Sequence, residues 1–186
     1  MASAGRAGQA LSPGTQRLFF ALWPEDGVRA ALAHTARRMH GVFHGSRTRD
    51  QSLHLTLVFL GDVDVEHLSL LLDPPDDICV PAFELALDEW GGWSRNKIGW
   101  AAPSQVPQPL RELVANLEAW LRTAEFAIER RAFLPHVTLV RKAQATRMPE
   151  PMKPITWMVR DFHLIHSQAG PGGSRYEAIG SWPLRA

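Results

Sequence analysis

Apolar residues occur along this chain in short runs typical of strands and in longer stretches with helical spacing. Residues 17–23 (RLFFALW) form an apolar, aromatic run that ends at Pro24 and is too short for a helix, so it predicts a buried strand. Residues 53–60 (LHLTLVFL), ended by Gly61, predict a second strand. Further strands are predicted over residues 83–90, 98–102, 133–141, 155–167 and 176–182.

Two of these strands are expected to form an antiparallel pair. Apolar and polar residues alternate from Phe83 to Trp90, and residues 98–102 form another short run. Gly91 and Gly92 lie between the two runs and predict the turn that joins them.

Three helices are predicted between the strands. Pro24, followed by two acidic residues, is typical of a first helical turn, and Gly41 is the predicted end of this helix. A short helix is expected over residues 65–72. The clearest helical spacing is that of Leu110, Leu113, Val114, Leu117, Trp120 and Leu121.

Strands outnumber helices and mix with them along the chain, which predicts an α+β fold. The small, polar residues 1–15 are interpreted as a flexible tail, and residues 16–186 as a single domain. Hydrophobic residues make up 45% of the chain and charged residues 21%, as in globular proteins. No apolar run approaches the roughly 18 residues that would span a bilayer, so no membrane association is expected.

The net charge indicates which partners the protein can bind, and the cysteine content indicates its cellular compartment. The formal net charge is +1, which argues against binding a long nucleic acid by bulk electrostatics, so any anion site is expected to be local. Cys79 is the only cysteine, which excludes an internal disulfide and fits a reducing cytoplasm. We expect a cytoplasmic monomer.

One short motif occurs twice, as LHLTL around residue 54 and as PHVTL around residue 136. In a strand, residues two apart share a face, so His54 is expected beside Thr56 and His136 beside Thr138. The repetition suggests a pseudo-symmetric fold in which two equivalent strands present these polar residues to a common groove.

Two histidines and two hydroxyl groups suit the hydrolysis of a cyclic phosphodiester. The reaction needs a base that takes a proton from water and an acid that protonates the departing ribose oxygen. The unperturbed histidine pKa of about 6.5 allows one neutral and one cationic ring near neutral pH. The threonine hydroxyls can bind non-bridging phosphate oxygens, and such a strained cyclic ester requires no metal or cofactor.

Two other histidines are not expected to form a metal site. His163 and His166 lie three apart on a predicted strand, so their side chains should point to opposite faces.

The repeated motif also leaves a non-enzymatic alternative open, namely a groove that binds RNA ends or nucleotides without turnover.

The sequence resembles the 2H phosphoesterase superfamily and, within it, the RNA 2′,3′-cyclic phosphodiesterases that are also called 2′-5′ RNA ligases. The resemblance is carried by RLFFALWPEDGVRAAL, LHLTLVFLGDV, NKIGWAAP and RAFLPHVTLVRK, and it extends from about Arg17 to Lys142. It implies a bilobal, pseudo-symmetric fold with two mainly antiparallel sheets around a central cleft and helices outside.

The resemblance also implies roles for individual residues. His136 would take the proton from water and His54 would protonate the leaving 3′ oxygen, which gives a 2′-phosphomonoester at an RNA end or on a nucleotide. Arg131 matches an arginine that precedes the second motif and would contact phosphate or ribose. Phe133 is a candidate for stacking on a base, although a phenylalanine on a strand is more often a core residue. Reversible 2′-5′ RNA joining by the same groups is a further alternative.

Overall fold

The computed structural model describes residues 14–76, 78, 80–129, 132–148, 150–171 and 173–185. Its strands are β1 (Thr15–Leu22), β2 (Ser46–Arg47), β3 (Leu55–Asp64), β4 (Phe83–Leu87), β5 (Glu89–Trp93), β6 (Ile98–Ala102), β7 (Val137–Arg141), β8 (Ile155–Val159), β9 (Asp161–Gln168) and β10 (Arg175–Pro183). Its helices are α1 (Asp26–Phe43), α2 (Leu68–Leu71) and α3 (Gln108–Thr123), with 3-10 turns at Asp50–Ser52 and Val65–His67.

Most strands belong to one antiparallel sheet that is narrow at its centre. Its order is β10-β9-β1-β3-β7-β6-β5, with β2 also paired to β7. The two halves of the sheet, β10-β9-β1-β3 and β7-β6-β5, meet at a single pair, Leu55 with Val137. Strands β4 and β8 form a separate two-stranded sheet. The predicted α+β class is thus confirmed, with the two halves joined as one sheet at this pair.

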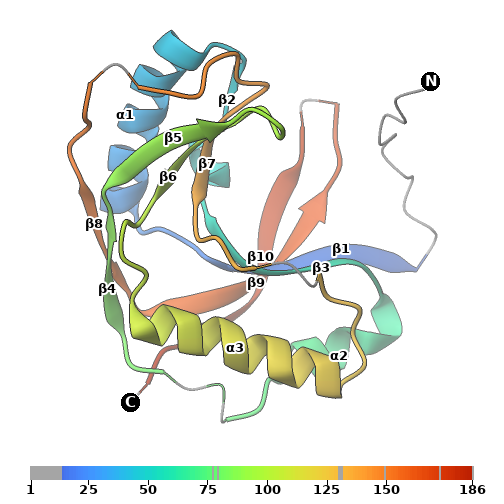
Figure 1. Cartoon of the computed structure of the whole chain (residues 1–186). Coiled ribbons are helices and arrows are strands. Elements are labelled where there is room, and N and C mark those ends of the chain that lie inside the picture. Colours follow the sequence, from blue (N-terminus) through green and yellow to red (C-terminus); the bar gives the residue numbers. More distant parts are fainter. Residues whose placement is uncertain are drawn as a thin grey trace.

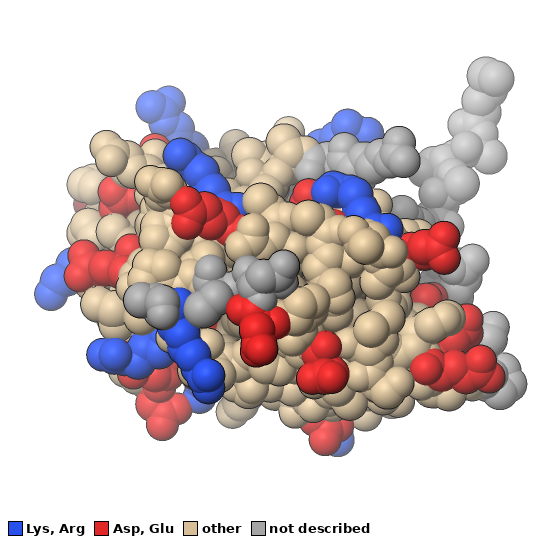
Figure 2. Space-filling model, turned by 90° about the horizontal axis from the view of Figure 1, so that it is seen from below, with Lys and Arg blue, Asp and Glu red and all other residues tan. Residues whose placement is uncertain are grey.

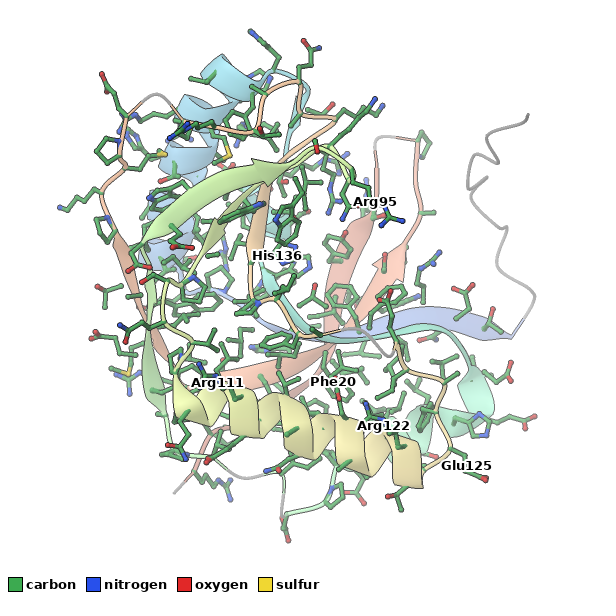
Figure 3. All side chains as sticks on the ribbon, viewed as in Figure 1. Phe20, Arg95, Arg111, Arg122, Glu125 and His136 are labelled. Carbon is green, nitrogen blue, oxygen red and sulfur yellow. The ribbon has the colours of Figure 1, made fainter. Side chains whose placement is uncertain are left out.

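Each half of the sheet is covered by a helix (Figure 1). Helix α1 lies beside β7 and β6, and α3 lies across the other half, under β1 and β3. The rings of Phe20 on β1 and Trp120 on α3 are 6.0 Å apart, and Figure 3 shows Phe20 between this strand and the helix. Gly99 on β6 lets α1 approach closely, because a Cβ atom there would lie 2.5 Å from the sulfur of Met39. Each of the two long helices therefore packs against one half of the sheet.

Strand β1 is buried on both faces, as its continuous apolar run predicts. Leu18, Phe20 and Leu22 belong to the main core, which includes both long helices. Phe19 and Ala21 point the other way, into a small second cluster with Ile165. This second cluster lies beside the histidine motif that precedes β3, because the rings of Phe19 and His54 are 4.9 Å apart.

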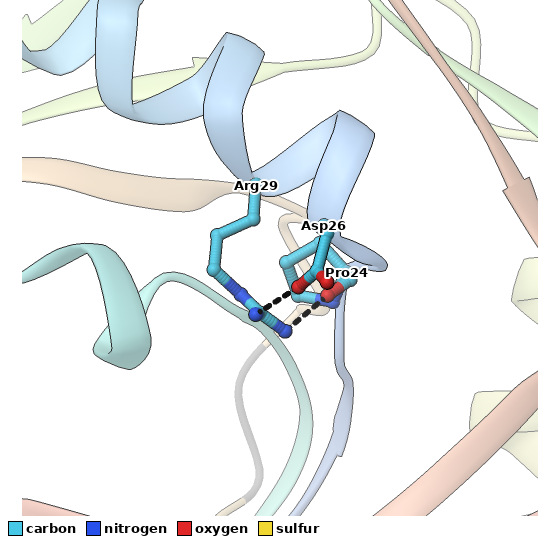
Figure 4. Close-up of polar contacts among 3 residues, drawn as sticks. All are labelled: Pro24, Asp26 and Arg29. Carbon is cyan, nitrogen blue, oxygen red and sulfur yellow. Dashed lines mark hydrogen bonds and ion pairs between the residues drawn. The ribbon is translucent and has the colours of Figure 1, made fainter.

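Helix α1 begins where the sequence predicts and ends two residues later than predicted. Arg29 donates hydrogen bonds to Asp26 (2.7 Å) and to the carbonyl of Pro24 (2.6 Å), which ties the first turn to the end of β1 (Figure 4). Gly41 remains helical, and the chain leaves the helix at His44 (φ 53°) and Gly45 (φ 81°). A positive φ is the ordinary means of ending a helix, and glycine adopts it without strain.

Two strand predictions are wrong. Gly91 and Gly92 do not form a turn but lie inside β5, which pairs with β6, and residues 94–97 connect these strands. Strand β4 pairs instead with β8, which lies far along the sequence. The predicted strand over residues 155–167 is divided at Arg160 into β8 and β9, which belong to different sheets.

The surface seen from the α3 side has interspersed charges of both signs (Figure 2). This mixture agrees with the net charge of +1. Among the described residues, no helix is both long and apolar enough to cross a membrane. The predicted tail of residues 1–15 lies almost wholly outside the described part of the chain. The first strand, β1, starts at Thr15.

Candidate active site

The two histidine motifs lie side by side where the halves of the sheet meet. His54 directly precedes β3 and His136 directly precedes β7, so each is one residue before the Leu55–Val137 pair. In an antiparallel register, this pair places His54 beside Thr138 and Thr56 beside His136. All four polar side chains then share one face, around a local two-fold axis through the pair. By this register each histidine is next to the threonine of the other motif, and of these four residues His54 and Thr56 line the cavity described below.

Both imidazole rings are oriented by the same backbone contact. Nδ1 of His54 is 2.8 Å from the carbonyl oxygen of Ser52, and Nδ1 of His136 is 2.8 Å from that of Leu134. A carbonyl oxygen only accepts hydrogen bonds, so Nδ1 carries the proton in each ring. Nε2 is therefore the atom of each histidine that can take or give a proton during a reaction.

Aromatic rings surround His54 on several sides. Trp23 is stacked on it, with ring centroids 5.4 Å apart and an angle of 8° between the planes. Phe19 lies 4.9 Å away and Tyr176 5.1 Å away, the latter edge-on. His136 has a ring contact with Trp93, which is edge-on at 4.7 Å. Figure 3 shows His136 at β7, below the turn between β5 and β6 that bears Arg95.

The surroundings of His54 make its ring hard to protonate. Burial among the aromatic rings lowers the pKa of His54 from 6.5 to about 4. The hydrogen bond to Ser52 raises this pKa, whereas the charge of Arg141 and the nearby His136 lower it further. The effect of His136 agrees with the Leu55–Val137 pair, which places the two motifs side by side. His54 is consequently neutral at pH 7 in the protein alone.

A cavity of about 340 Å³ extends from His54 along β3 and β1. His54 and Thr56 line it together, as the strand alternation predicts. Arg141 brings a positive charge into it, and Ser167 and Tyr176 contribute from β9 and β10. The cavity therefore combines an acid–base group, hydroxyl groups and a cation, which are the groups that a phosphate ester requires.

Phe59 and Arg141 are among the cavity residues that were not predicted from the sequence, although the sequence contains a signal for these two. The repeated motif continues for two more positions, as HLTLVF from His54 and HVTLVR from His136, so Phe59 and Arg141 are equivalent. Simple alternation would turn both residues away from the histidine face. A β-bulge in each strand reverses this phase, because Leu57 and Leu139 are skipped in the pairing with β1 and β6.

The other predicted site residues differ in what the structure says of them. Thr138 is half-buried on β7, opposite Trp100. Phe133 is half-buried and packs against the main core. Arg131 lies outside the described residues. His163 contacts Asp161 at 3.1 Å, and the described residues contain no group of three or more histidine, cysteine or acidic side chains placed to hold a metal ion.

The fold and the paired motifs define a class of protein, and sequence comparison identifies it. The profile of the 2′-5′ RNA ligase superfamily matches residues 24–171, and the chain belongs to this family. The RNA 2′,3′-cyclic phosphodiesterase of Escherichia coli is 32% identical over 170 residues, which cover 91% of this chain and 97% of that protein. The protein of the same name from Thermus thermophilus is 29% identical, with 91% and 90% coverage.

Solved structures agree with this assignment. E. coli LigT in its apo form superposes with a TM-score of 0.82 at 32% identity, covering 93% of this chain and 99% of LigT. LigT complexed with 3′-AMP gives a TM-score of 0.82 at 33% identity, with 92% and 99% coverage. The resemblance drawn from the two motifs is therefore confirmed over nearly the whole chain.

Proposed function

We propose that this chain hydrolyses 2′,3′-cyclic phosphates at RNA or nucleotide ends by acid–base catalysis with His54 and His136. The observation that carries this proposal is the Leu55–Val137 pair, which brings the two motifs together at one face of the sheet. The names of the curated relatives support the same reaction. The proposed enzyme is a phosphoric diester hydrolase that needs no metal or other cofactor.

The proposed reaction is a single displacement at phosphorus. Nε2 of His136 accepts a proton from water while the water oxygen bonds to phosphorus. The bond between phosphorus and the 3′ oxygen breaks, and Nε2 of His54 donates a proton to that oxygen, which leaves a 2′-phosphomonoester. Thr56 and Thr138 bind the non-bridging oxygens, and the charge of Arg141 stabilises the negative charge that develops on them. These roles for the two histidines follow the family resemblance.

The low pKa of His54 has a consequence for its proposed role as the general acid. With a pKa of about 4 the ring carries no proton to donate at pH 7, so its pKa must rise when substrate binds. A phosphate anion between the rings supplies this change, because its negative charge opposes that of Arg141 and favours the imidazolium form. If the pKa of His54 stayed low, this ring would be the base instead, and the opposite oxygen would leave.

Product analysis tests both the reaction and the assignment of roles. Purified protein is incubated with 2′,3′-cyclic AMP in the presence of EDTA, and the monophosphate isomers are separated by chromatography. The proposal predicts turnover to the 2′-monophosphate at an undiminished rate. Exclusive formation of the 3′-monophosphate would reverse the two histidine roles, and loss of turnover in EDTA would overturn metal-free catalysis. Binding without turnover would mean a nucleotide-binding module.

Some finer expectations belong to the same proposal. Arg131 remains a predicted phosphate or ribose contact, and Phe133 is better supported as a core residue because of its packing. We further propose that the chain works as a monomer in the cytoplasm, on RNA ends or small cyclic nucleotides. Size-exclusion chromatography with light scattering and cell fractionation test these two points.

A further inference from the structure

A second cavity lies on the side of β5 that faces away from the histidines. Its volume is about 610 Å³, within the range of roughly 300–1,000 Å³ that is usual for small-molecule sites. It lies between α1, β5 and the segment that joins β7 to β8, which runs beside α1 (Figure 1). We call it the rear cavity, and its lining residues are Val42, Trp90, Arg147, Met148, Glu150 and Pro151.

The alternation of side chains along β5 separates the rear cavity from the catalytic groups. Trp93 faces the catalytic side, since its ring contacts His136 edge-on. Gly92 faces α1, because a Cβ atom there would lie 3.0 Å from the ring of Phe43. Trp90 is two residues before Gly92 and therefore shares its face. A ligand in the rear cavity is thus separated from the two imidazoles by the sheet itself.

The outer wall of the rear cavity is fixed to the rest of the fold. The N–H of Gln144 donates a hydrogen bond of 2.7 Å to the carbonyl of Phe43, at the end of α1. Two residues later the chain lies close against β5, since a Cβ atom at Gly92 would be 2.8 Å from the Cα of Thr146. A wall that is already in place reduces the entropy that is lost when a ligand binds.

The inner surface of the rear cavity is apolar and partly aromatic. Val42, Trp90 and Met148 are half-buried and pack against the main core. An indole offers a flat surface on which an aromatic ring can stack, and a methionine sulfur makes favourable contacts with such a ring. This surface therefore suits the ring of an aromatic ligand.

The rim of the rear cavity has a net positive charge. Glu150 lies 3.8 Å from Arg38, which compensates its carboxylate. Within the described part of the chain, Arg147 lines the cavity and has no ion pair. A guanidinium binds a carboxylate through two parallel hydrogen bonds, which a neutral group does not match. The rim therefore favours a ligand with a carboxylate.

We propose that the rear cavity is a second binding site, which takes a small carboxylic acid with an aromatic ring. The ring lies against Trp90 and Met148, and Arg147 binds the carboxylate. This site is independent of the proposed reaction, because none of its lining residues belongs to the histidine motifs or lines the cavity beside His54.

Calorimetric titration with 3-phenylpropionate tests the site, and the neutral 3-phenylpropionamide is the comparison. We expect a Kd below about 1 mM for the acid, which the usual free energy per ligand atom allows for a molecule of this size. The amide should bind at least about fivefold more weakly, because it lacks the charge that Arg147 recognises. Added salt should weaken the binding of the acid more than that of the amide.

Two arginine variants locate the carboxylate. Arg147→Gln changes an exposed residue, so the fold should be retained, and it should weaken the binding of the acid about fivefold or more while leaving that of the amide unchanged. Arg141→Gln is the matched control, because it removes an arginine from the cavity beside His54 instead, and it should leave the Kd of the acid unchanged.

NMR spectroscopy locates the aromatic ring of the ligand. The indole N–H signal of Trp90, assigned by its loss in Trp90→Phe, should shift as 3-phenylpropionate is added. The indole N–H signal of Trp23, which is stacked on His54, should remain unchanged. The opposite pattern would place the ligand beside the histidines and overturn the rear site.

The remaining failures are equally clear. The proposal is overturned by the absence of saturable binding of the acid up to about 10 mM, by equal affinities for the acid and the amide, or by an unchanged Kd in Arg147→Gln. Each of these results leaves the proposed reaction intact, because turnover of 2′,3′-cyclic AMP is measured separately. Absence of that turnover would overturn the proposed function without affecting the rear cavity.

Discussion

The two copies of the histidine motif have the same residues and the same hydrogen bond but different surroundings. Both Nδ1 atoms donate to the carbonyl two residues earlier. His54 is enclosed by Phe19, Trp23 and Tyr176, and His136 has an edge-on ring contact with Trp93. A duplicated motif therefore provides symmetric positions, and the aromatic rings packed around His54 make its imidazole hard to protonate. The proposed reaction needs one protonated and one neutral ring at the same pH, so the pKa of His54 has to rise on substrate binding if this ring is the acid.

The largest effect is expected from removing either imidazole. We predict that His54→Ala and His136→Ala each lower kcat by at least about 10²- to 10⁴-fold, since each ring moves a proton in the same step. Binding of adenosine 2′-monophosphate should change far less. His34→Ala, at an exposed position on α1, is the control and should retain full activity. Near-normal activity in either site variant would mean that the two copies do not act as a pair.

A smaller effect is expected at the threonines. Thr56→Val and Thr138→Val keep the strand shape and remove a hydroxyl that would bind a charged phosphate oxygen. Such a hydrogen bond contributes about 1.5–3 kcal/mol, so each variant should lose roughly tenfold to a hundredfold in kcat/KM. The register around Leu55 and Val137 predicts similar losses at the two positions. A loss at only one threonine would break the proposed symmetry of phosphate binding.

The aromatic surroundings of His54 can be tested by titration. Trp23→Leu removes the stacked ring and exposes the imidazole to water, so we predict that the pKa of His54 rises from about 4 toward 6.5. Trp93→Leu, beside the other motif, is the matched control and should leave the pKa of His54 nearly unchanged. NMR titration of the histidine ring protons measures both. An unchanged pKa in Trp23→Leu would show that the stacked ring does not cause the low pKa of His54.

The smallest effect is on stability and depends on pH. The pKa of His54 is about 4 in the folded chain and 6.5 when unperturbed, so between these values the unfolded state binds more protons than the folded state. The free energy of unfolding from this residue therefore decreases as pH falls from about 6.5 to about 4. His54→Gln should lose less stability over this range than the unaltered protein, as urea unfolding at pH 7 and pH 4.5 would measure. His34→Gln should behave like the unaltered protein, and so would His54→Gln if burial did not affect this pKa.

Local sequence patterns predicted most helices and strands. They could not predict which strands that are far apart in the sequence pair with each other. The spacing from Leu110 to Leu121 predicts α3, whose buried residues follow it. The alternation of Phe83, Leu85 and Leu87 predicts β4, but nothing in it identifies β8 as the partner strand. Two glycines next to that alternation suggested a turn because glycine is common in turns, whereas in β5 a Cβ at Gly91 would lie 2.8 Å from Trp100. A close contact of this kind depends on a neighbour that only the folded chain supplies.

In the candidate site, too, local patterns predicted some residues, and those that depend on strand pairing or distant segments were missed. The repeat of histidine and threonine predicts which residues form the proposed reacting groups, because its period of two matches a strand. Phe59 and Arg141 were missed because a bulge changes that period, and an extra residue in a strand is defined only by its pairing with a neighbour. Trp23 and Tyr176 were missed because they come from the end of β1 and from β10, far from the motif in the sequence.

The most direct test of the account is a crystal structure of this protein with adenosine 2′-monophosphate. The two motifs are proposed to act on a single phosphorus from opposite sides of the Leu55–Val137 pair. The account predicts that Nε2 of His54 and Nε2 of His136 each lie about 2.6–3.2 Å from oxygen atoms of the same phosphate. A phosphate that contacts only one of the two imidazoles, or a ligand bound away from both, would contradict it.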